Sequence, residues 1–165
     1  MAAPLEAGLL LGVDPGLAAT GWALVDTESR LVACGTVRTP PGPPGPRLLA
    51  IVNELQAVLA GHRVTEAALE ELFMGRNATS ALAVAQARGA VLTALAAAGV
   101  PIHEYKPAQV KSVLTGYGMA DKAQMGRMLA RQMEVEGAPD EHARDAVAIA
   151  VCHLRSRRLR LVTRT

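Results

Sequence analysis

LLLGVDPG, residues 9–16, is a compact apolar run that ends in an acidic residue and a Pro-Gly turn. A short apolar run closed by such a turn is typical of a buried strand. Asp14 is therefore expected at the end of a strand, where a rigid support can aim its carboxylate into a cleft. An Asp that only initiates the turn fits the same pattern, so the run alone leaves both roles open.

Two further β-prone runs follow this strand. They cover residues 21–25 (GWALV) and 31–37 (LVACGTV), and the polar stretch 26–30 between them suits a hairpin connection. Together with residues 9–14 they predict three consecutive antiparallel strands. Residues 39–46 are rich in Pro and Gly, and we interpret them as a short surface loop rather than a linker between domains.

The rest of the chain alternates between helical and strand patterns. Apolar residues at helical spacing predict helices, and β-prone runs predict two more strands. The expected order is a helix over 47–59, a strand over 67–73, a helix over 80–98 ended by Gly99, a strand over 101–105, and helices over 107–114, 121–133 and 139–154. Three meandering strands followed by β-α-β and helices predict an α/β fold with a mixed sheet flanked by helices.

The composition indicates one globular domain over residues 1–165. Half of the 165 residues are hydrophobic, which is enough for a core that needs no metal or disulfide. Cys34 and Cys152 lack the spacing of a zinc site or a disulfide framework. The apolar run at 9–13 is too short to span a bilayer, and Glu6 precedes it rather than the positive charges of a signal peptide. We therefore expect a cytoplasmic protein without membrane contact.

Positive charge gathers at the end of the chain. The formal net charge is only +2, which by itself says little about partners. Five arginines nevertheless follow residue 154 with no carboxylate among them: Arg155, Arg157, Arg158, Arg160 and Arg164. This basic C-terminal tail, from about residue 155, suits contact with a phosphate backbone, although a solvated terminus fits the pattern equally well.

Glu70 lies within the apolar strand expected over residues 67–73. Burial of a carboxylate there is unfavourable unless a cation or hydrogen-bond donors hold it, which favours a metal-binding role. Side chains alternate along a strand, so the neighbouring Glu71 faces the opposite side. We therefore choose Glu70 as the functional acid of the pair.

Another group of polar residues opens the last predicted helix. His142 and Asp145 stand three residues apart and so project from the same helix face. The preceding Pro and acids suit a helix start, where Asp140 can serve as the N-cap. Together with Asp14 and Glu70, His142 and Asp145 can form a compact site for divalent cations.

Such a site suits the hydrolysis of a phosphodiester. The reaction needs a deprotonated water and stabilisation of charge on the attacking and leaving oxygens, which two cations about 4 Å apart supply. Carboxylate oxygens favour Mg²⁺ or Mn²⁺, and a histidine ligand shifts the preference towards Mn²⁺. We therefore expect two ions per site and greater activity with Mn²⁺.

Short polar and glycine-containing motifs continue along most of the chain. They are GVDPG (12–16) with TGW (20–22), EELFM (70–74) with Asn77, SA (80–81), QARG (86–89), YKP (105–107) with QVK (109–111), GYG (116–118) with DK (121–122), and DAVAIA (145–150). Each motif is weak alone, but the ordered combination is highly specific. In order and spacing they resemble the signature segments of the RuvC family of Holliday-junction resolvases.

The resemblance implies a ribonuclease H-like α/β fold with a mixed five-stranded sheet flanked by helices. It also implies a structure-specific endonuclease that resolves Holliday junctions in DNA recombination and repair. Asp14, Glu70 and Asp145 match the catalytic metal-binding acids, and His142 stands where many relatives have another Asp. That departure affects the metal preference more than the reaction. Asp140 is a second choice for the fourth ligand, because its offset from Asp145 turns it away from that helix face.

The same resemblance assigns DNA contacts and partners. Phe73, the only Phe of the chain, matches an aromatic residue that stacks on a base near the junction, whereas a core position is the alternative. Lys111 and Lys122 match positions that bind phosphate near the scissile bond. A homodimer is implied, and its two-fold axis would match that of a four-way junction, so that paired sites nick two opposed strands. A RuvA and RuvB branch-migration complex is implied as a further partner.

Other functions fit parts of the pattern. A junction-binding module without catalysis would keep the basic residues but would have no need of Asp14, Glu70 and Asp145. An actin-like nucleotide-binding fold also has an early strand that ends in Asp, but it requires a second similar domain that 165 residues cannot supply. A nuclease of the same fold that acts on RNA is the remaining alternative, and an assay of substrates must distinguish it.

Overall fold

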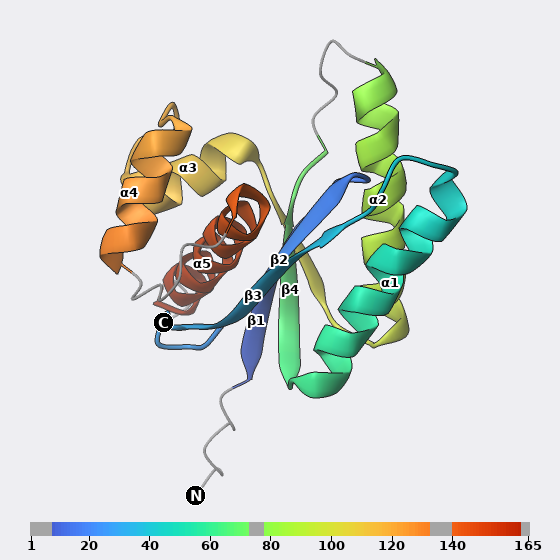
Figure 1. Cartoon of the computed structure of the whole chain (residues 1–165). Helices are drawn as coiled ribbons and strands as arrows, with labels where there is room; N and C mark the ends of the chain where they lie inside the picture. The colour runs from blue at the N-terminus through green and yellow to red at the C-terminus, as the bar shows by residue number, and fades with distance from the viewer. Residues whose placement is uncertain (1–7, 73–77, 133–139, 163–165) are drawn as a thin grey trace, which may run out of the picture.

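The computed structural model describes residues 8–72, 78–132 and 140–162 (Figure 1). Its strands are β1 (Leu9–Asp14), β2 (Ala19–Val25), β3 (Leu31–Arg38), β4 (Val64–Glu70) and β5 (Ile102–Tyr105). Its helices are α1 (Pro44–Gly61), α2 (Ala78–Ala97), α3 (Pro107–Thr115), α4 (Lys122–Gln132) and α5 (Glu141–Val162). The predicted order of strands and helices is confirmed.

The five strands form one mixed sheet in the order β3-β2-β1-β4-β5. The first three strands are antiparallel neighbours, as expected for hairpin connections, whereas β4 pairs parallel to β1 and β5 pairs parallel to β4. The parallel connections run through helices α1 and α2. The predicted mixed five-stranded sheet is therefore confirmed, and β1 and β4 lie in its middle.

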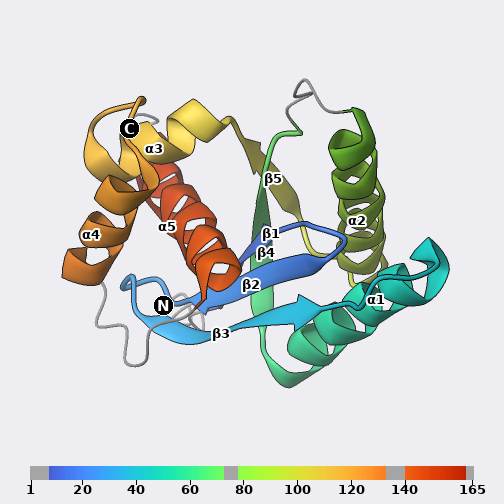
Figure 2. The same cartoon turned by 45° about the horizontal axis from the view of Figure 1, so that its top comes forward.

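Helices cover both faces of the sheet (Figure 2). Alternate side chains of one strand point to the two layers: Leu11 packs in the cluster with α1 and α2, and Leu10 in the cluster with α3, α4 and α5. The same alternation places Ala67 in the first cluster and Ala68 in the second. Helix α5 lies directly against the middle of the sheet.

Helix α1 begins earlier than the sequence predicts. Residues 39–46 are expected to form a loop without helix, yet the helix starts at Pro44, with Pro43 as its N-cap. The amide groups of the first helical turn have no partner within the helix, so the missing N–H groups of Pro44 and Pro46 remove no helical hydrogen bond. The expectation was wrong for the last residues of this segment.

Helix α5 is longer than predicted and includes part of the basic segment. The expected end was residue 154, but the helix continues to Val162. Arg155 donates to the backbone oxygen of Val113 at 3.1 Å, and Arg158 donates to the backbone oxygen of Thr27. These hydrogen bonds tie Arg155 to α3 and Arg158 to the turn after β2, which charge counting alone does not show.

Helix α2 is long and apolar enough to cross a membrane by length and composition alone. Its inner face nevertheless packs on the sheet, where Ala87, Val91 and Leu95 belong to the core. Gly99, just beyond it, adopts a positive φ of 68° and ends the helix, as its sequence position predicts. The helix therefore contributes one face to the core, and its outer side is exposed.

Candidate active site

Asp14 and Glu70 end the two central parallel strands. The last paired residues of these strands are Val13 and Leu69, so the next positions, Asp14 and Glu70, lie side by side at one edge of the sheet. Strand alternation turns both side chains towards the α5 layer, since Leu69 faces the other layer. Both acids are partly buried. The register of β1 and β4 thus brings together two residues that are 56 positions apart in the sequence.

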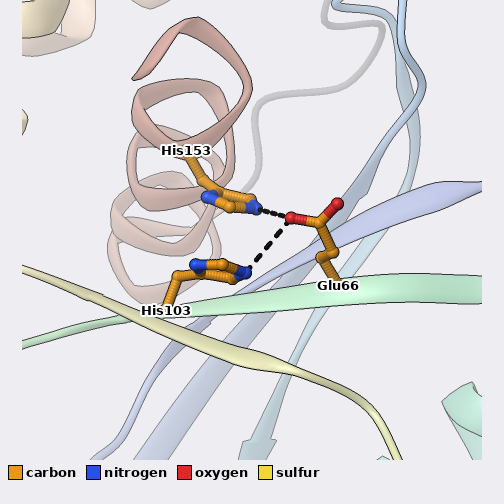
Figure 3. A group of neighbouring side chains, drawn as sticks. All are labelled: Glu66, His103 and His153. Atoms are coloured by element: carbon orange, nitrogen blue, oxygen red, sulfur yellow. Dashed lines mark hydrogen bonds and ion pairs between the residues drawn. The ribbon is translucent and has the colours of Figure 1, made fainter. Parts of the chain in front are cut away.

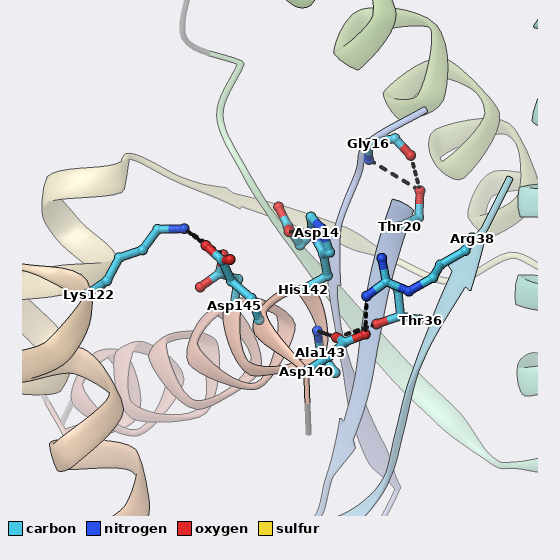
Figure 4. A network of polar contacts seen from close by, with 11 residues as sticks. Asp14, Gly16, Thr20, Thr36, Arg38, Lys122, Asp140, His142, Ala143 and Asp145 are labelled. Carbon is cyan, nitrogen blue, oxygen red and sulfur yellow. Dashed lines mark hydrogen bonds and ion pairs between the residues drawn. The ribbon is translucent and has the colours of Figure 1, made fainter. Parts of the chain in front are cut away.

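The first turns of α5 bring His142 and Asp145 to the same place (Figure 4). The Nδ1 atom of His142 lies 3.3 Å from Oδ2 of Asp14. Asp145 lines a cavity of about 590 Å³ together with Asp14 and Glu70. His142 is not among the lining residues and contacts the site through Asp14.

Two glycines allow α5 to approach the sheet this closely. A Cβ atom on Gly21 of β2 would lie 2.0 Å from the backbone oxygen of His142. A Cβ atom on Gly12 of β1 would lie 2.1 Å from the backbone oxygen of Ala146. Any larger residue would push the helix outward, so these glycines determine how near His142 and Asp145 come to Asp14.

Asp140 fixes the start of α5 and is not among the residues that line the cavity. Its Oδ1 accepts hydrogen bonds from the backbone N–H of Ala143 at 3.0 Å and from the hydroxyl of Thr36 at 2.7 Å. Arg38 donates to Oδ2 at 2.7 Å. These donors, led by the Ala143 amide, lower the pKa of Asp140 to about 2. The side chain is thus an N-cap tied to β3, and both of its carboxylate oxygens already accept hydrogen bonds from the protein.

Lysines face the acids across the cavity. Lys122 pairs with Glu141, and its Nζ lies 3.7 Å from Oδ2 of Asp145. Its side chain is 75% exposed, so the ammonium remains accessible to a ligand. Lys111 of α3 also lines the cavity and is close enough to Glu70 to counter its raised pKa. The cavity is therefore lined by acids together with two lysines, Lys111 and Lys122, which are called the basic rim below.

Burial raises the pKa values of the three carboxylates. For Asp14, burial is the largest cause and repulsion by Asp145 comes next, while the hydrogen bond to His142 acts in the opposite direction. For Glu70, burial is again first, followed by repulsion from Asp14 and Asp145. Burial also raises the pKa of Asp145, and Lys122 partly offsets this. The acids disfavour one another's ionised forms, and a bound cation would offset this electrostatic repulsion.

This donor set fits hard divalent cations. Three partly buried carboxylates share one cavity, and an imidazole touches one of them. Oxygen ligands of this kind suit Mg²⁺ or Mn²⁺. Arrangements that shift several pKa values in one cleft are also typical of active sites.

The structure brings together most of the predicted site residues. Asp14, Glu70, Asp145, Lys111 and Lys122 line one cavity, and His142 contacts Asp14. Phe73 lies outside the described residues, so its predicted stacking role stays a prediction.

Three contacts were missed from the sequence. Glu141 holds Lys122, a role that its position four residues before Asp145 could have suggested. Arg88 of α2 donates to the backbone oxygen of Glu70 at 2.6 Å and pairs with Glu104, which anchors the end of β4. No local pattern marks that contact, or the one between Thr36 and Asp140.

The fold and the site together define a ribonuclease H-like nuclease class, with acids on two central strands and a helix. The sequence profile of the family described as "Crossover junction endodeoxyribonuclease RuvC" matches residues 10–153. A relative of that name from Chloroflexus aurantiacus is 48% identical over 148 residues, covering 87% of this chain and 90% of the relative. Another, from Alkalilimnicola ehrlichii, is 43% identical and covers 88% and 90%.

Solved structures agree with the sequence comparison. Thermus thermophilus RuvC in complex with a Holliday junction substrate superimposes with a TM-score of 0.84 at 34% identity, covering 92% of this chain and 96% of that one. The yeast mitochondrial Holliday junction resolvase Ydc2, at 11% identity and a TM-score of 0.65, shares the fold. This chain belongs to the crossover junction endodeoxyribonuclease RuvC family. Membership implies dependence on a divalent metal.

Proposed function

We propose that this protein resolves Holliday junctions by metal-dependent hydrolysis of DNA phosphodiesters in recombination and repair. The observation that carries the proposal is the convergence of Asp14, Glu70 and Asp145 on one cavity, within a fold shared with a junction-bound relative. A module that only binds junctions would not need three partly buried acids that raise one another's pKa. Catalysis explains why the fold retains this arrangement.

Asp14, Glu70 and Asp145 would hold divalent cations, with His142 as a further ligand beside Asp14. Two cations, when bound, promote deprotonation of the attacking water and stabilise charge on the leaving oxygen. The chain's own acids hold this position rigidly, because they project from strand ends and from the first turns of a capped helix. We expect two ions per site and stronger activity with Mn²⁺ than with Mg²⁺, because Mn²⁺ tolerates imidazole better.

The basic rim would position the DNA backbone over these acids. Lys122 lies beside Asp145 yet keeps its side chain largely exposed, so it can bind a phosphate while its present partner Glu141 holds it nearby. Lys111 would bind a phosphate on the side of Glu70. Phe73 would stack on a base near the junction, which is worth about 1–3 kcal/mol per base.

Pairing of two sites requires a second copy of the chain. We infer a homodimer, whose two-fold axis would match that of a four-way junction. The outer side of α2 suits such contact, since Leu82 is 63% exposed and Gly89 and Thr93 are exposed on the same helix. Residues 1–165 would act as one nuclease domain in the cytoplasm, with RuvA and RuvB as branch-migration partners and the basic end from about residue 155 near the DNA.

A comparison of substrates tests the reaction. Purified protein should cleave a synthetic four-way junction in Mn²⁺ with paired nicks on opposed strands, and it should leave linear duplex DNA and an RNA–DNA hybrid intact. Cleavage of the hybrid alone would show an RNA-directed nuclease of the same fold. Binding of the junction without cleavage in any divalent metal would show a binding module.

A substitution of His142 tests the metal preference separately. His142→Asp replaces the imidazole with a fourth carboxylate, beside Asp14, so it should raise the ratio of Mg²⁺-supported to Mn²⁺-supported cleavage. Rates at saturating concentrations of each metal provide the measurement. If the wild type cleaves as fast in Mg²⁺ as in Mn²⁺, the histidine does not set the preference.

A further inference from the structure

A second group of metal-binding residue types lies on the same sheet face as the active site, further along β4. It consists of Glu66 on β4, His103 on β5 and His153 on α5 (Figure 3). His103 pairs with Ala68 in the parallel register and so faces α5, as Glu66 does. The three side chains come from three elements and point to one spot. None of them takes part in the proposed nuclease site.

The ligand atoms of the three side chains lie close together. Oε2 of Glu66 lies 2.9 Å from Nε2 of His153 and 3.2 Å from Nε2 of His103. The two imidazole rings stack, with centroids 4.4 Å apart and planes 28° apart, and both Nε2 atoms lie beside Glu66; a shared ion requires the rings to tilt towards a common point. One ligand atom from each of the three residues lies within 4.8 Å of the others.

Contacts with residues outside the group hold His153 and Glu66 in orientations that suit metal binding. The hydroxyl of Tyr105 lies 2.7 Å from Nδ1 of His153. If Nδ1 carries the proton and donates it to this hydroxyl, the lone pair of Nε2 is directed at the centre of the group. Nη1 of Arg157 lies 3.2 Å from Oε1 of Glu66, which leaves Oε2 as the inward oxygen. Partners of this kind orient ligands in metal sites generally.

We propose that Glu66, His103 and His153 bind a Zn²⁺ ion, with a water as the fourth ligand. Two imidazole nitrogens and one carboxylate oxygen are a borderline donor set that favours zinc over Mg²⁺. Tetrahedral zinc with bonds of about 2.0–2.1 Å requires ligand atoms roughly 3.3 Å apart. The separations of Glu66 Oε2 from the two Nε2 atoms are within a few tenths of an ångström of this requirement. Glu66 and His103 have side chains 20% and 33% exposed, so an ion and a water can reach them.

A hydrogen-bonded network without metal is the competing arrangement. In it, each Nε2 would carry a proton and donate it to Glu66, and the Tyr105 hydroxyl would donate to Nδ1 of His153. Zinc binding requires the opposite tautomer, because a protonated Nε2 has no lone pair to offer. The two arrangements therefore differ in which nitrogen is protonated, and this difference can be measured.

The zinc site is separate from the nuclease site. Glu66 and Glu70 are four residues apart on β4, about 13 Å along a strand. His153 and Asp145 are eight residues apart on α5, about 12 Å along a helix. A bound ion would connect the edge strand β5, the central strand β4 and the C-terminal half of α5, and so stabilise the layer that carries His142 and Asp145.

Zinc stoichiometry of the chain of residues 1–165 tests the proposal. The Asp14→Asn, Asp145→Asn double variant weakens metal binding at the nuclease site and serves as the background. After removal of metal by a chelator, addition of Zn²⁺ in excess Mg²⁺ and dialysis, elemental analysis should find one zinc per chain. Adding His103→Gln, at a partly exposed edge-strand position, should remove it. An equal zinc content with and without His103→Gln would overturn the proposal.

Two further measurements test the proposal without relying on the folding of the His103→Gln variant. In the background protein, zinc at a hundredfold excess over its dissociation constant should lower the unfolding equilibrium constant about 100-fold. ¹⁵N-detected spectra of the imidazoles should show His103 and His153 changing from Nε2–H to Nδ1–H forms as Zn²⁺ is added. Unchanged Nε2–H signals on both residues at saturating Zn²⁺ would establish the hydrogen-bonded network instead.

Discussion

Replacement of Gly21 by alanine tests whether the close approach of α5 to the sheet determines catalysis. The new Cβ would lie 2.0 Å from the backbone oxygen of His142, whereas ordinary contact begins at 3.4 Å. The helix start must therefore retreat by about 1.4 Å, the difference between these distances. A misplacement of 1 Å in catalytic geometry can reduce a rate about 100-fold, and we expect a loss of at least this order in junction cleavage.

Single-turnover cleavage of a labelled junction in Mn²⁺ measures the effect, and fluorescence anisotropy without divalent metal shows whether the junction still binds. Overpacking should also lower the free energy of unfolding by about 1–3 kcal/mol, so the assay must run well below the melting temperature. Gly61→Ala is the matched control, because a Cβ there meets no described atom within 4 Å. A folded Gly21→Ala protein that cleaves at the wild-type rate would refute the reasoning.

Further predictions concern charge and capping. Asp140→Ala should lower the free energy of unfolding by about 1–2 kcal/mol, whereas Asp140→Asn, which keeps an N-cap acceptor, should lose less; equal losses in chemical denaturation would show that capping is not the cause. Because the pKa of Asp140 is lowered to about 2, its contribution is present at neutral pH and is lost as the pH falls from about 4 through 2, so the two variants should converge with the wild type in acid. Asp14→Asn should abolish cleavage and preserve junction binding. Since burial raises the pKa of Asp14, its ionised form opposes folding, and without metal Asp14→Asn should melt at a higher temperature than the wild type at neutral pH. This gain in melting temperature should vanish below about pH 4, where Asp14 is protonated in both the folded and the unfolded state. A lower melting temperature for Asp14→Asn at neutral pH would contradict the raised pKa. Lys122→Ala should weaken junction binding most at low salt and reduce the slope of log affinity against log salt by about one, and an unchanged slope would show that Lys122 touches no phosphate.

Much of the site could be predicted because its residues interrupt local patterns. Asp14 ends an apolar run, Glu70 is an acid in an apolar strand, and His142 and Asp145 share a helix face. Each of these signals lies within a few residues of sequence. The order of strands and helices also predicts the mixed sheet, whereas the pairing of β1 with β4, which sets Asp14 beside Glu70, is found only in the structure.

The parts that could not be predicted depend on contacts between distant segments. Asp140 bonds to Thr36, 104 residues away, and only the packing of α5 over β3 brings them together. Glu66 and His103 look like ordinary polar residues of two strands until the register places them opposite His153. The start of α1 at Pro44 was missed for a different reason, since prolines are excluded from helix interiors but tolerated in the first turn.

The distribution of the acids along the chain has a consequence during synthesis. Asp14 and Glu70 meet as soon as β1 and β4 pair, but Asp145 belongs to the last helix and reaches them only when α5 docks on Gly12 and Gly21. Domains fold on the ribosome as their segments emerge. A nascent chain that ends before α5 therefore holds an incomplete set of acids, and the cavity gains its third carboxylate only after α5 has been synthesised and has docked.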